Sequence, residues 1–276
     1  SSTRIVPVIA TVVDAQGRVT EDWRQWDKLF TRAHDVEISP YDPQKAVWVV
    51  DAEGHAVYKF SNDGKQLLQT IGTPEVPGAD GTHFNRPTFM AWDSDGSFYV
   101  ADGYNGTRVA KFDKDGKFLM DWGQKGESGK ETRPSYFNNV HGIAVDVPSR
   151  RVVVNDRDNH RIQIFDENGK YLSEFKINVS PSSLHMVEVG EDGTIGTFDR
   201  NTHKMLKYTL DGKLIYSWGT IGDFPGTVWG VHGMSTDREG NLYVAEVDSG
   251  RFQKFVPRPG ANPAYLISKP VKAVWE

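Results

Sequence analysis

One pattern recurs along the 276-residue chain at intervals of about 45 to 55 residues, and it constrains the fold more than any other feature. It can be read in "VWVVDAEGHAVYKFSNDGKQLLQTIG" and again in "FYVADGYNGTRVAKFDKDGKFLMDWG". Each copy has an apolar strand, an acidic turn, a second strand that ends in an aromatic residue, a hairpin and a third strand. One more short strand precedes each copy, as in "VHGIAVD" and "VHGMSTD". Glycine marks the hairpins because it readily adopts a positive φ, in the pairs Asp63-Gly64, Asp115-Gly116, Asn168-Gly169 and Asp211-Gly212.

Four short strands per unit at this spacing predict the blades of a β-propeller, an all-β fold. Complete blades are expected for five units, over about residues 33–267. The N-terminal "VIATVVDAQGRVTEDW" has the pattern of two further strands, and the C-terminal "PVKAVWE" could add a strand beside them. We therefore predict a single domain over residues 1–276 with six blades, the sixth shared by the termini, which leaves no free sheet edge. A ring of five blades is the alternative.

Composition excludes several classes of function. The chain has no cysteine, so disulfides, thiolate metal sites and cysteine nucleophiles are absent. A net charge of −5 gives no basic surface for nucleic acid. No apolar run is long enough to span a membrane. The sequence does not identify a compartment, although a secreted or periplasmic location is favoured.

Histidine recurs at one position of the repeat. The first strand of a propeller blade lines the central channel, and its equivalent residue in the five complete blades is His34, Thr88, His141, His185 and His232. Four of these five positions are histidine in a chain that has 8 histidines. The repeat could reuse histidine to bond a neighbouring blade, or the imidazoles could converge on a ligand.

A six-bladed ring favours the second interpretation. Its blades lie about 60° apart, so the first, third and fifth place His34, His141 and His232 about 120° apart around the axis. Three nitrogen ligands that leave a position open are typical of catalytic zinc, although copper, iron or nickel would also accept them. His185 is expected to be a fourth ligand, a second-layer hydrogen-bond donor or a substrate contact.

The turns after each second strand open on the same end of the channel. Their acidic residues are expected to bond nearby backbone amides, and they are Asp51, Asp102, Asp156, Asp199 and Glu246. Tyr104 and Arg157 are not needed to form a turn, which makes them candidates for a catalytic base and an anion-binding group. Thr88, Arg200 and Trp229 are expected to line the pocket.

The repeat resembles the NHL type of β-propeller, and the order of its features is similar to the peptidyl-α-hydroxyglycine α-amidating lyases. The likeness covers roughly residues 8–255 and is densest in "HFNRPTFMAWDSDGSFYVADGYNGTRVAKFDKDGKFLMDWG", "NNVHGIAVD" and "VNDRDNHRIQIF". The resemblance implies a catalytic zinc on His34, His141 and His232, with Tyr104 as the catalytic tyrosine and Arg157 as a pocket arginine. It further implies removal of glyoxylate from a C-terminal α-hydroxyglycine, and a structural calcium ion.

The chain departs from that pattern at three places. A second active-site arginine of the family lies upstream, in strands that this chain lacks. A pocket methionine of the family corresponds to Gly230, and an acidic calcium ligand corresponds to Gly233. We therefore expect a metal-dependent lyase, or a related hydrolase, that acts on a peptide C-terminus or a small α-hydroxy or amide-like substrate. A non-catalytic propeller that binds proteins or glycans, and a redox enzyme with four-histidine iron, are the alternatives.

Overall fold

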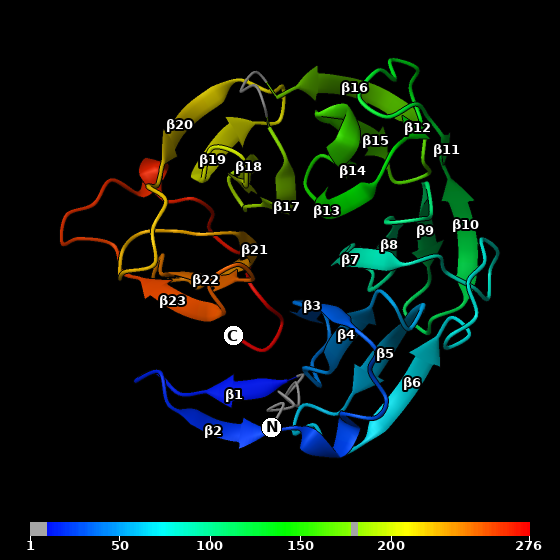
Figure 1. The fold of residues 1–276 in the computed structure, drawn as a ribbon, viewed down its shortest axis with the longest axis horizontal. Helices are drawn as coiled ribbons and strands as arrows, with labels where there is room; N and C mark the ends of the chain where they lie inside the picture. Colours follow the sequence, from blue (N-terminus) through cyan, green and yellow to red (C-terminus); the bar gives the residue numbers. More distant parts are fainter. Residues whose placement is uncertain (1–9, 178–181) are drawn as a thin grey trace, which may run out of the picture.

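The structure is a computed structural model that describes residues 10–177 and 182–276. Its sheets are arranged around a central channel, with the first strand of each sheet innermost (Figure 1). Antiparallel pairing joins consecutive strands within each of the five blades, as in the first one. The first two sheets contain β3 (Ala33–Ile38), β4 (Val47–Asp51), β5 (Ala56–Phe60) and β6 (Leu67–Ile71), then β7 (Pro87–Trp92), β8 (Phe98–Asp102), β9 (Arg108–Phe112) and β10 (Phe118–Trp122).

Three further sheets follow in chain order. The third and fourth contain β13 (Val140–Asp146), β14 (Arg151–Asp156), β15 (Arg161–Asp166) and β16 (Tyr171–Lys176), then β17 (Leu184–Val189), β18 (Thr194–Asp199), β19 (Lys204–Thr209) and β20 (Leu214–Trp218). The fifth contains β21 (Val231–Thr236), β22 (Leu242–Glu246) and β23 (Arg251–Phe255). The all-β propeller predicted from the repeat is confirmed, and the structure has five blades.

This count matches the alternative and not the favoured number of six. The N-terminal strands β1 (Thr11–Val13) and β2 (Val19–Asp22) pair only with each other among the described residues, and Val8 and Ile9 of the expected strand lie outside them. Their hairpin lies between the first and fifth blades (Figure 1). A short helix η1 (Arg24–Trp26) follows it, and Trp26 Nε1 donates to the carbonyl of Gly64 at 2.7 Å, which attaches this segment to the first blade.

The fifth blade also differs from expectation, because it has three strands rather than four. The segment expected to form its outer strand contains Pro257 and Pro259 and then the short helix η3 (Pro263–Tyr265). Proline has no backbone N–H to donate to a strand ladder, which explains why no strand forms here. The C-terminal residues 270–276 form no strand either, and Val274 N–H instead donates to Pro40 O at 2.9 Å.

The hairpin predictions are confirmed. Gly64, Gly116, Gly169 and Gly212 all have a positive φ, between 65° and 86°. Each of these N–H groups donates to the carbonyl three residues earlier, and the strand register shifts beside each turn. Besides the N-terminal hairpin, η1 and η3, two further small elements lie outside the blades: the parallel pair β11 (Gln124–Lys125) and β12 (Tyr136–Phe137), and the helix η2 (Arg157–Asn159). No helix among the described residues is long and apolar enough to cross a membrane.

The hydrophobic core lies between neighbouring blades. One cluster joins Phe89 and Phe137 to residues of the third, fourth and fifth blades, such as Phe198. Another packs Trp48 of the first blade against Phe98 of the second, with ring centroids 5.1 Å apart. This packing leaves the inner strands to line a channel whose two ends differ in chemistry.

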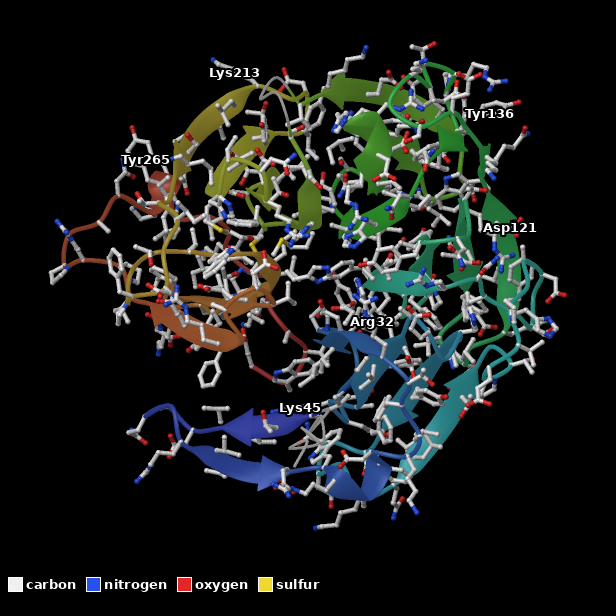
Figure 2. All side chains as sticks on the ribbon, viewed as in Figure 1. Arg32, Lys45, Asp121, Tyr136, Lys213 and Tyr265 are labelled. Carbon is white, nitrogen blue, oxygen red and sulfur yellow. The ribbon has the colours of Figure 1, made fainter. Side chains whose placement is uncertain are left out.

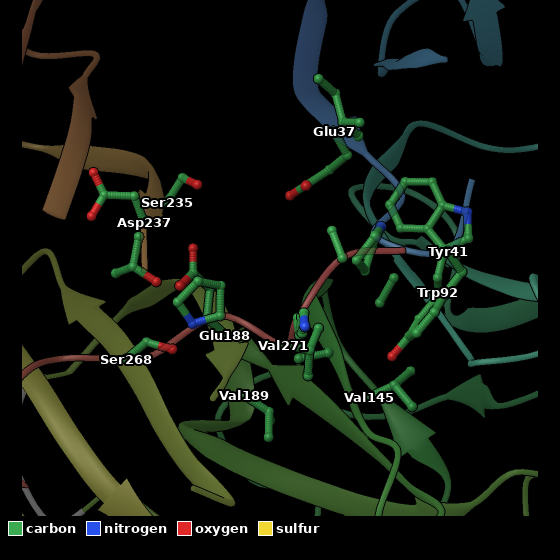
Figure 3. A pocket seen from close by; sticks show the side chains of 18 of the residues that line it. Glu37, Tyr41, Trp92, Val145, Glu188, Val189, Ser235, Asp237, Ser268 and Val271 are labelled. Atoms are coloured by element: carbon green, nitrogen blue, oxygen red, sulfur yellow. The ribbon is translucent and has the colours of Figure 1, made fainter. Parts of the chain in front are cut away.

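One end of the channel holds an acidic cluster. A cavity of about 910 Å³ lies at the C-terminal ends of the inner strands and is lined in part by residues 268–276. Glu37 and Glu188 approach it from opposite sides (Figure 3). Burial raises the pKa of Asp35 to about 7, and burial with the nearby Asp35 carboxyl raises the pKa of Glu188 to about 8. Burial also raises the pKa of Glu37 well above its ordinary value.

Glu188→Gln should make the protein less sensitive to alkaline pH. The folded protein holds the Glu188 proton to about pH 8, whereas the unfolded chain releases it near 4.5, so stability falls as pH rises between these values. The amide cannot ionise, and the variant should lose less stability between pH 5 and pH 8 than the wild type does. Urea unfolding at both pH values measures this, with the exposed Glu21→Gln as the matched control. Equal losses in wild type and Glu188→Gln would contradict the assignment.

Candidate metal centre

A β-bulge lies at the same place in all five inner strands. The register shifts between Ala33 and Asp35 in β3, around His34, and between Val140 and Ile143 in β13, around His141. The corresponding shifts in β7, β17 and β21 fall around Thr88, His185 and His232. A bulge bends a strand and turns a side chain away from the regular alternation. The local backbone therefore directs this one residue of each blade toward the channel.

Four of these five side chains bond the backbone of the next blade, whereas His232 makes no such bond to a described residue. His34 Nδ1–H donates to Thr88 O at 2.8 Å, Thr88 Oγ1–H donates to His141 O at 2.7 Å, and His141 Nδ1–H donates to His185 O. His185 Nδ1–H donates to Val231 O at 2.8 Å. Histidine at this position does bond a neighbouring blade, as one interpretation of the sequence expected. Because a carbonyl only accepts, these bonds fix the Nδ1–H tautomer of His34, His141 and His185 and leave each Nε2 with a free lone pair.

Three of the histidines converge. One ligand atom from each of His34, His141 and His232 lies within 4.8 Å of the other two. Tyr104 Oη lies 2.9 Å from His34 Nε2 and 3.1 Å from His141 Nε2. The single phenol proton can serve only one of these two acceptors. The unprotonated Nε2 atoms of His34 and His141, with the imidazole of His232 beside them, form a donor set that fits a divalent cation.

Burial keeps these imidazoles neutral. His141 is fully buried, and burial lowers its pKa well below the ordinary value, with a further contribution from the positive charge of Arg157. Burial also lowers the pKa of His34 to about 3 and that of His232 to about 2, although the bond to Thr88 opposes the shift at His34. Metal ions bind the neutral form of histidine, so all three side chains are in the required state at neutral pH.

His185 lies beside this group. Its ring centroid is 4.7 Å from that of His232 and 6.0 Å from that of His141. Its pKa is lowered to about 4, chiefly by burial. The convergent set among the described residues contains three histidines and not His185. His185 is therefore placed as a neighbour of the centre and as a lining residue of the cavity above it.

That cavity has a volume of about 440 Å³ and opens where the turns after the second strands meet. Tyr104, Arg157 and Arg200 line it, together with three of the four axial histidines. Its lining residues are Arg32, Ala33, His34, Tyr104, Arg157, His185, Arg200, His232, Val247 and Asp248. Of the two remaining residues expected at the pocket, Thr88 is fully buried and bonded to backbone carbonyls, and Trp229 lies outside the lining.

The acidic turn residues have the structural role expected of them. Each carboxylate accepts a hydrogen bond from a backbone N–H just before the inner strand of its own blade, for example Asn85 N–H to Asp102 at 2.7 Å and Asn138 N–H to Asp156 at 2.8 Å. The equivalent donors in the other blades are Thr31 and Arg32 to Asp51, Ser183 to Asp199, and Trp229 to Glu246. These bonds fix the start of each inner strand and therefore position the backbone that carries the histidines.

Sequence reasoning missed Arg32, Arg86 and Asp248. Arg32 and Arg86 stand two residues before His34 and Thr88, so the alignment that identified the histidines contained a signal for both. Figure 2 shows Arg32 near the inner end of the first blade, close to the channel. Asp248 gave no such signal, because its partner belongs to another blade. It lies in the turn after β22 of the fifth blade, and its Oδ1 is 2.8 Å from Nη2 of Arg200 in the fourth blade.

Comparisons with known proteins agree with this architecture. A family model for the NHL repeat matches residues 137–165. Peptidyl-alpha-hydroxyglycine alpha-amidating lyase 1 of Drosophila melanogaster is 28% identical over 94% of this chain and 50% of its own length. Peptidyl-glycine alpha-amidating monooxygenase A of Xenopus laevis is 28% identical over 83% of this chain and 25% of its own length. NHL repeat-containing protein 3 of Mus musculus is 29% identical over 88% of this chain and 72% of its own.

This chain thus spans about half the length of the fruit-fly lyase and about a quarter of the frog monooxygenase. Among solved structures, a streptogramin B lyase has a TM-score of 0.57 at 15% identity, over 84% of this chain and 71% of the other. That likeness concerns the fold alone. Taken together, these similarities show that the chain is a β-propeller that contains an NHL-repeat match over residues 137–165 and is similar in sequence to peptidyl-alpha-hydroxyglycine alpha-amidating lyases.

Proposed function

We propose that the protein is a metal-dependent carbon–nitrogen lyase of the peptidyl-α-hydroxyglycine type, which acts on a carbinolamide that carries a carboxylate. The observation that carries this proposal is the convergence of His34, His141 and His232 beside the hydroxyl of Tyr104. The relatives named as amidating lyases support the reaction class.

The three histidines would hold a divalent ion, with zinc the first choice. Such an ion supplies a Lewis acid that polarises an oxygen of the substrate. The remaining chemistry belongs to the chain. In its phenolate form, Tyr104 Oη takes the proton of the substrate hydroxyl while the carbon–nitrogen bond breaks. The hydroxyl carbon becomes the aldehyde of glyoxylate, and the proton passes from Tyr104 to the leaving nitrogen, which departs as an amide.

Arg157 is suited to hold the carboxylate of the substrate. Its side chain is only 16% exposed, and its nearest carboxylate oxygen, on Asp158, is 3.6 Å away. The guanidinium lies 5.3 Å from the centre of the Tyr104 ring, so an anion bound to Arg157 is beside the proposed base. A planar guanidinium grips a carboxylate through two parallel hydrogen bonds, which also fixes its orientation.

Arg157→Ala should raise KM by about tenfold or more, because a charge-assisted hydrogen bond to the substrate is lost. Arg157→Lys should recover only part of the affinity, since an ammonium group cannot bind a carboxylate through two parallel bonds. Steady-state kinetics with α-hydroxyhippurate, a minimal carbinolamide, measure both variants. An unchanged KM in Arg157→Ala would remove this residue from substrate binding.

The experiment that tests the function is release of glyoxylate from α-hydroxyhippurate by the metal-loaded protein and by the same sample after chelation. The proposal expects turnover that disappears with the metal and returns when zinc is restored. Turnover that requires oxygen and iron would instead support a redox enzyme. A protein that binds no metal and releases no glyoxylate would support a propeller that serves only as a binding scaffold.

A further inference from the structure

Three arginines surround the ring of Tyr104. The guanidinium carbons of Arg86, Arg157 and Arg32 lie 5.0, 5.3 and 5.7 Å from the ring centre. Glu53 is shared by two of them, because it accepts a hydrogen bond from Arg86 and lies 3.5 Å from Arg32 Nη1. The cluster therefore carries more positive than negative charge immediately around the proposed catalytic hydroxyl.

The donors of this cluster also outnumber their acceptors. Arg157 makes no side-chain hydrogen bond to any described residue, and its nearest carboxylate oxygen is 3.6 Å away. The buried Nε of Arg86 has no acceptor among the described residues. A guanidinium has five N–H donors, and leaving them unpaired in a partly buried site is costly. A bound anion would satisfy these donors.

The cavity above the histidines has the same imbalance. Of the residues that line it, Arg32, Arg157 and Arg200 are basic and Asp248 is acidic. Arg200 is already paired, because its Nη2 lies 2.8 and 3.1 Å from the two oxygens of Asp248. Arg32 and Arg157 have weaker partners: Arg32 Nη1 lies 3.5 Å from Glu53, which it shares with Arg86, and Arg157 Nε lies 3.6 Å from Asp158. Both therefore retain N–H donors for a ligand in the cavity, and one carboxylate can bind only one of them through two parallel bonds.

The backbone of Arg86 supports a functional role for the cluster. Its φ is 64°, in the left-handed region that costs a side-chain-bearing residue about 1 kcal/mol or more. The equivalent residues two places before the axial position in the third and fifth blades, Asn139 and Gly230, have φ values of 65° and 66°. Asparagine and glycine are the residues that tolerate this conformation best. Arginine is the exception, and it is the residue that links Glu53 to the ring of Tyr104.

We propose that the site selects a small substrate with two anionic groups, one held by Arg157 beside Tyr104 and the other by Arg32, with Glu53 and Arg86 as positioning residues. The inference rests on the proposed function for the reaction, and on the arginines for the second charge. A volume of about 440 Å³ holds a small molecule of this kind. The substrate class is therefore an N-acyl α-hydroxyglycine whose acyl group ends in a carboxylate, rather than a neutral peptide.

Two isosteric substrates test this directly. N-succinyl-α-hydroxyglycine has the second carboxylate, and N-succinamoyl-α-hydroxyglycine has an amide in its place. The wild type should favour the acid by roughly ten- to a hundredfold in kcat/KM, and the preference should shrink as salt is added. In Arg32→Gln the ratio between the two substrates should fall toward one. Arg18→Gln, which removes the same charge from a distant and exposed position, should keep the wild-type ratio.

Equal kcat/KM values for the two substrates in the wild type, or an undiminished preference in Arg32→Gln, would overturn the inference. If neither compound is turned over, the proposed function fails. Calorimetry with the unreactive N-succinylglycine and N-succinamoylglycine then tests independently whether the site binds a second carboxylate. Tighter binding of the diacid by the wild type, lost in Arg32→Gln, would support the two-anion site. Equal binding of the two, or binding of neither, would reject it.

Discussion

Tyr104→Phe should slow turnover of α-hydroxyhippurate by about 10²- to 10⁴-fold, the usual contribution of a positioned general base. The substitution removes one oxygen and keeps the ring, whose contacts include T-shaped packing against His34 and His141 with centroids 5.2 Å away in both cases. Packing, and the positions of the surrounding arginines, should therefore change little. The loss should be in kcat, because the proton is taken only as the bond breaks.

Metal content must be measured beside the rate, because Tyr104 Oη contacts two proposed ligands. We expect Tyr104→Phe to bind the same amount of metal per chain as the wild type and to turn over substrate slowly. Equal rates at equal metal occupancy would remove Tyr104 from the mechanism. A slow variant that has also lost its metal would assign the residue to the metal centre instead of to proton transfer.

His141→Ala should remove most of the bound metal and with it all measurable lyase activity. His141 is the most enclosed member of the set, with its Nδ1–H bonded to His185 O and its Nε2 directed at the same point as that of His34. Two imidazoles and water bind a divalent ion much more weakly than three imidazoles do. Alanine at position 34 or 232 should have the same effect.

His185→Ala is the matched control for His141→Ala. His185 is also a buried axial histidine whose Nδ1–H donates to a carbonyl of the next blade, so its loss removes the same structural bond. Metal should stay largely bound in this variant. Elemental analysis of both proteins after removal of loosely bound ions gives the comparison, and thermal unfolding shows that both are folded. Loss of the metal from His185→Ala would instead indicate coordination by four histidines.

The repeat made much of this molecule predictable. Glycine at each hairpin, an acidic residue at each turn and an apolar second strand are local signals, and each has the conformation that its chemistry favours. The axial histidines were identified by counting along the repeat, without knowledge of the bulges that direct them inward. The terminal segments were harder to predict. The N-terminal run forms strands, but they pair with each other as a separate hairpin. Pro270 and the contact of Val274 with the first blade hold the C-terminal run over the channel.

The surroundings of Tyr104 were predicted only in part. Arg157 was identified because a turn does not need an arginine. Arg32 and Arg86 share one position of the repeat, but they were missed because that pattern does not show which side chains will meet a tyrosine from another segment. Their convergence depends on how the first and second blades are packed, which a local pattern does not contain.

The most direct test of the metal centre is a crystal of zinc-loaded protein measured on both sides of the zinc absorption edge. The anomalous difference map should contain one strong peak per chain, about 2.0–2.1 Å from one ring nitrogen of each of His34, His141 and His232. A map from protein that contains stoichiometric zinc but has no peak between these three imidazoles would contradict the metal centre and the mechanism built on it.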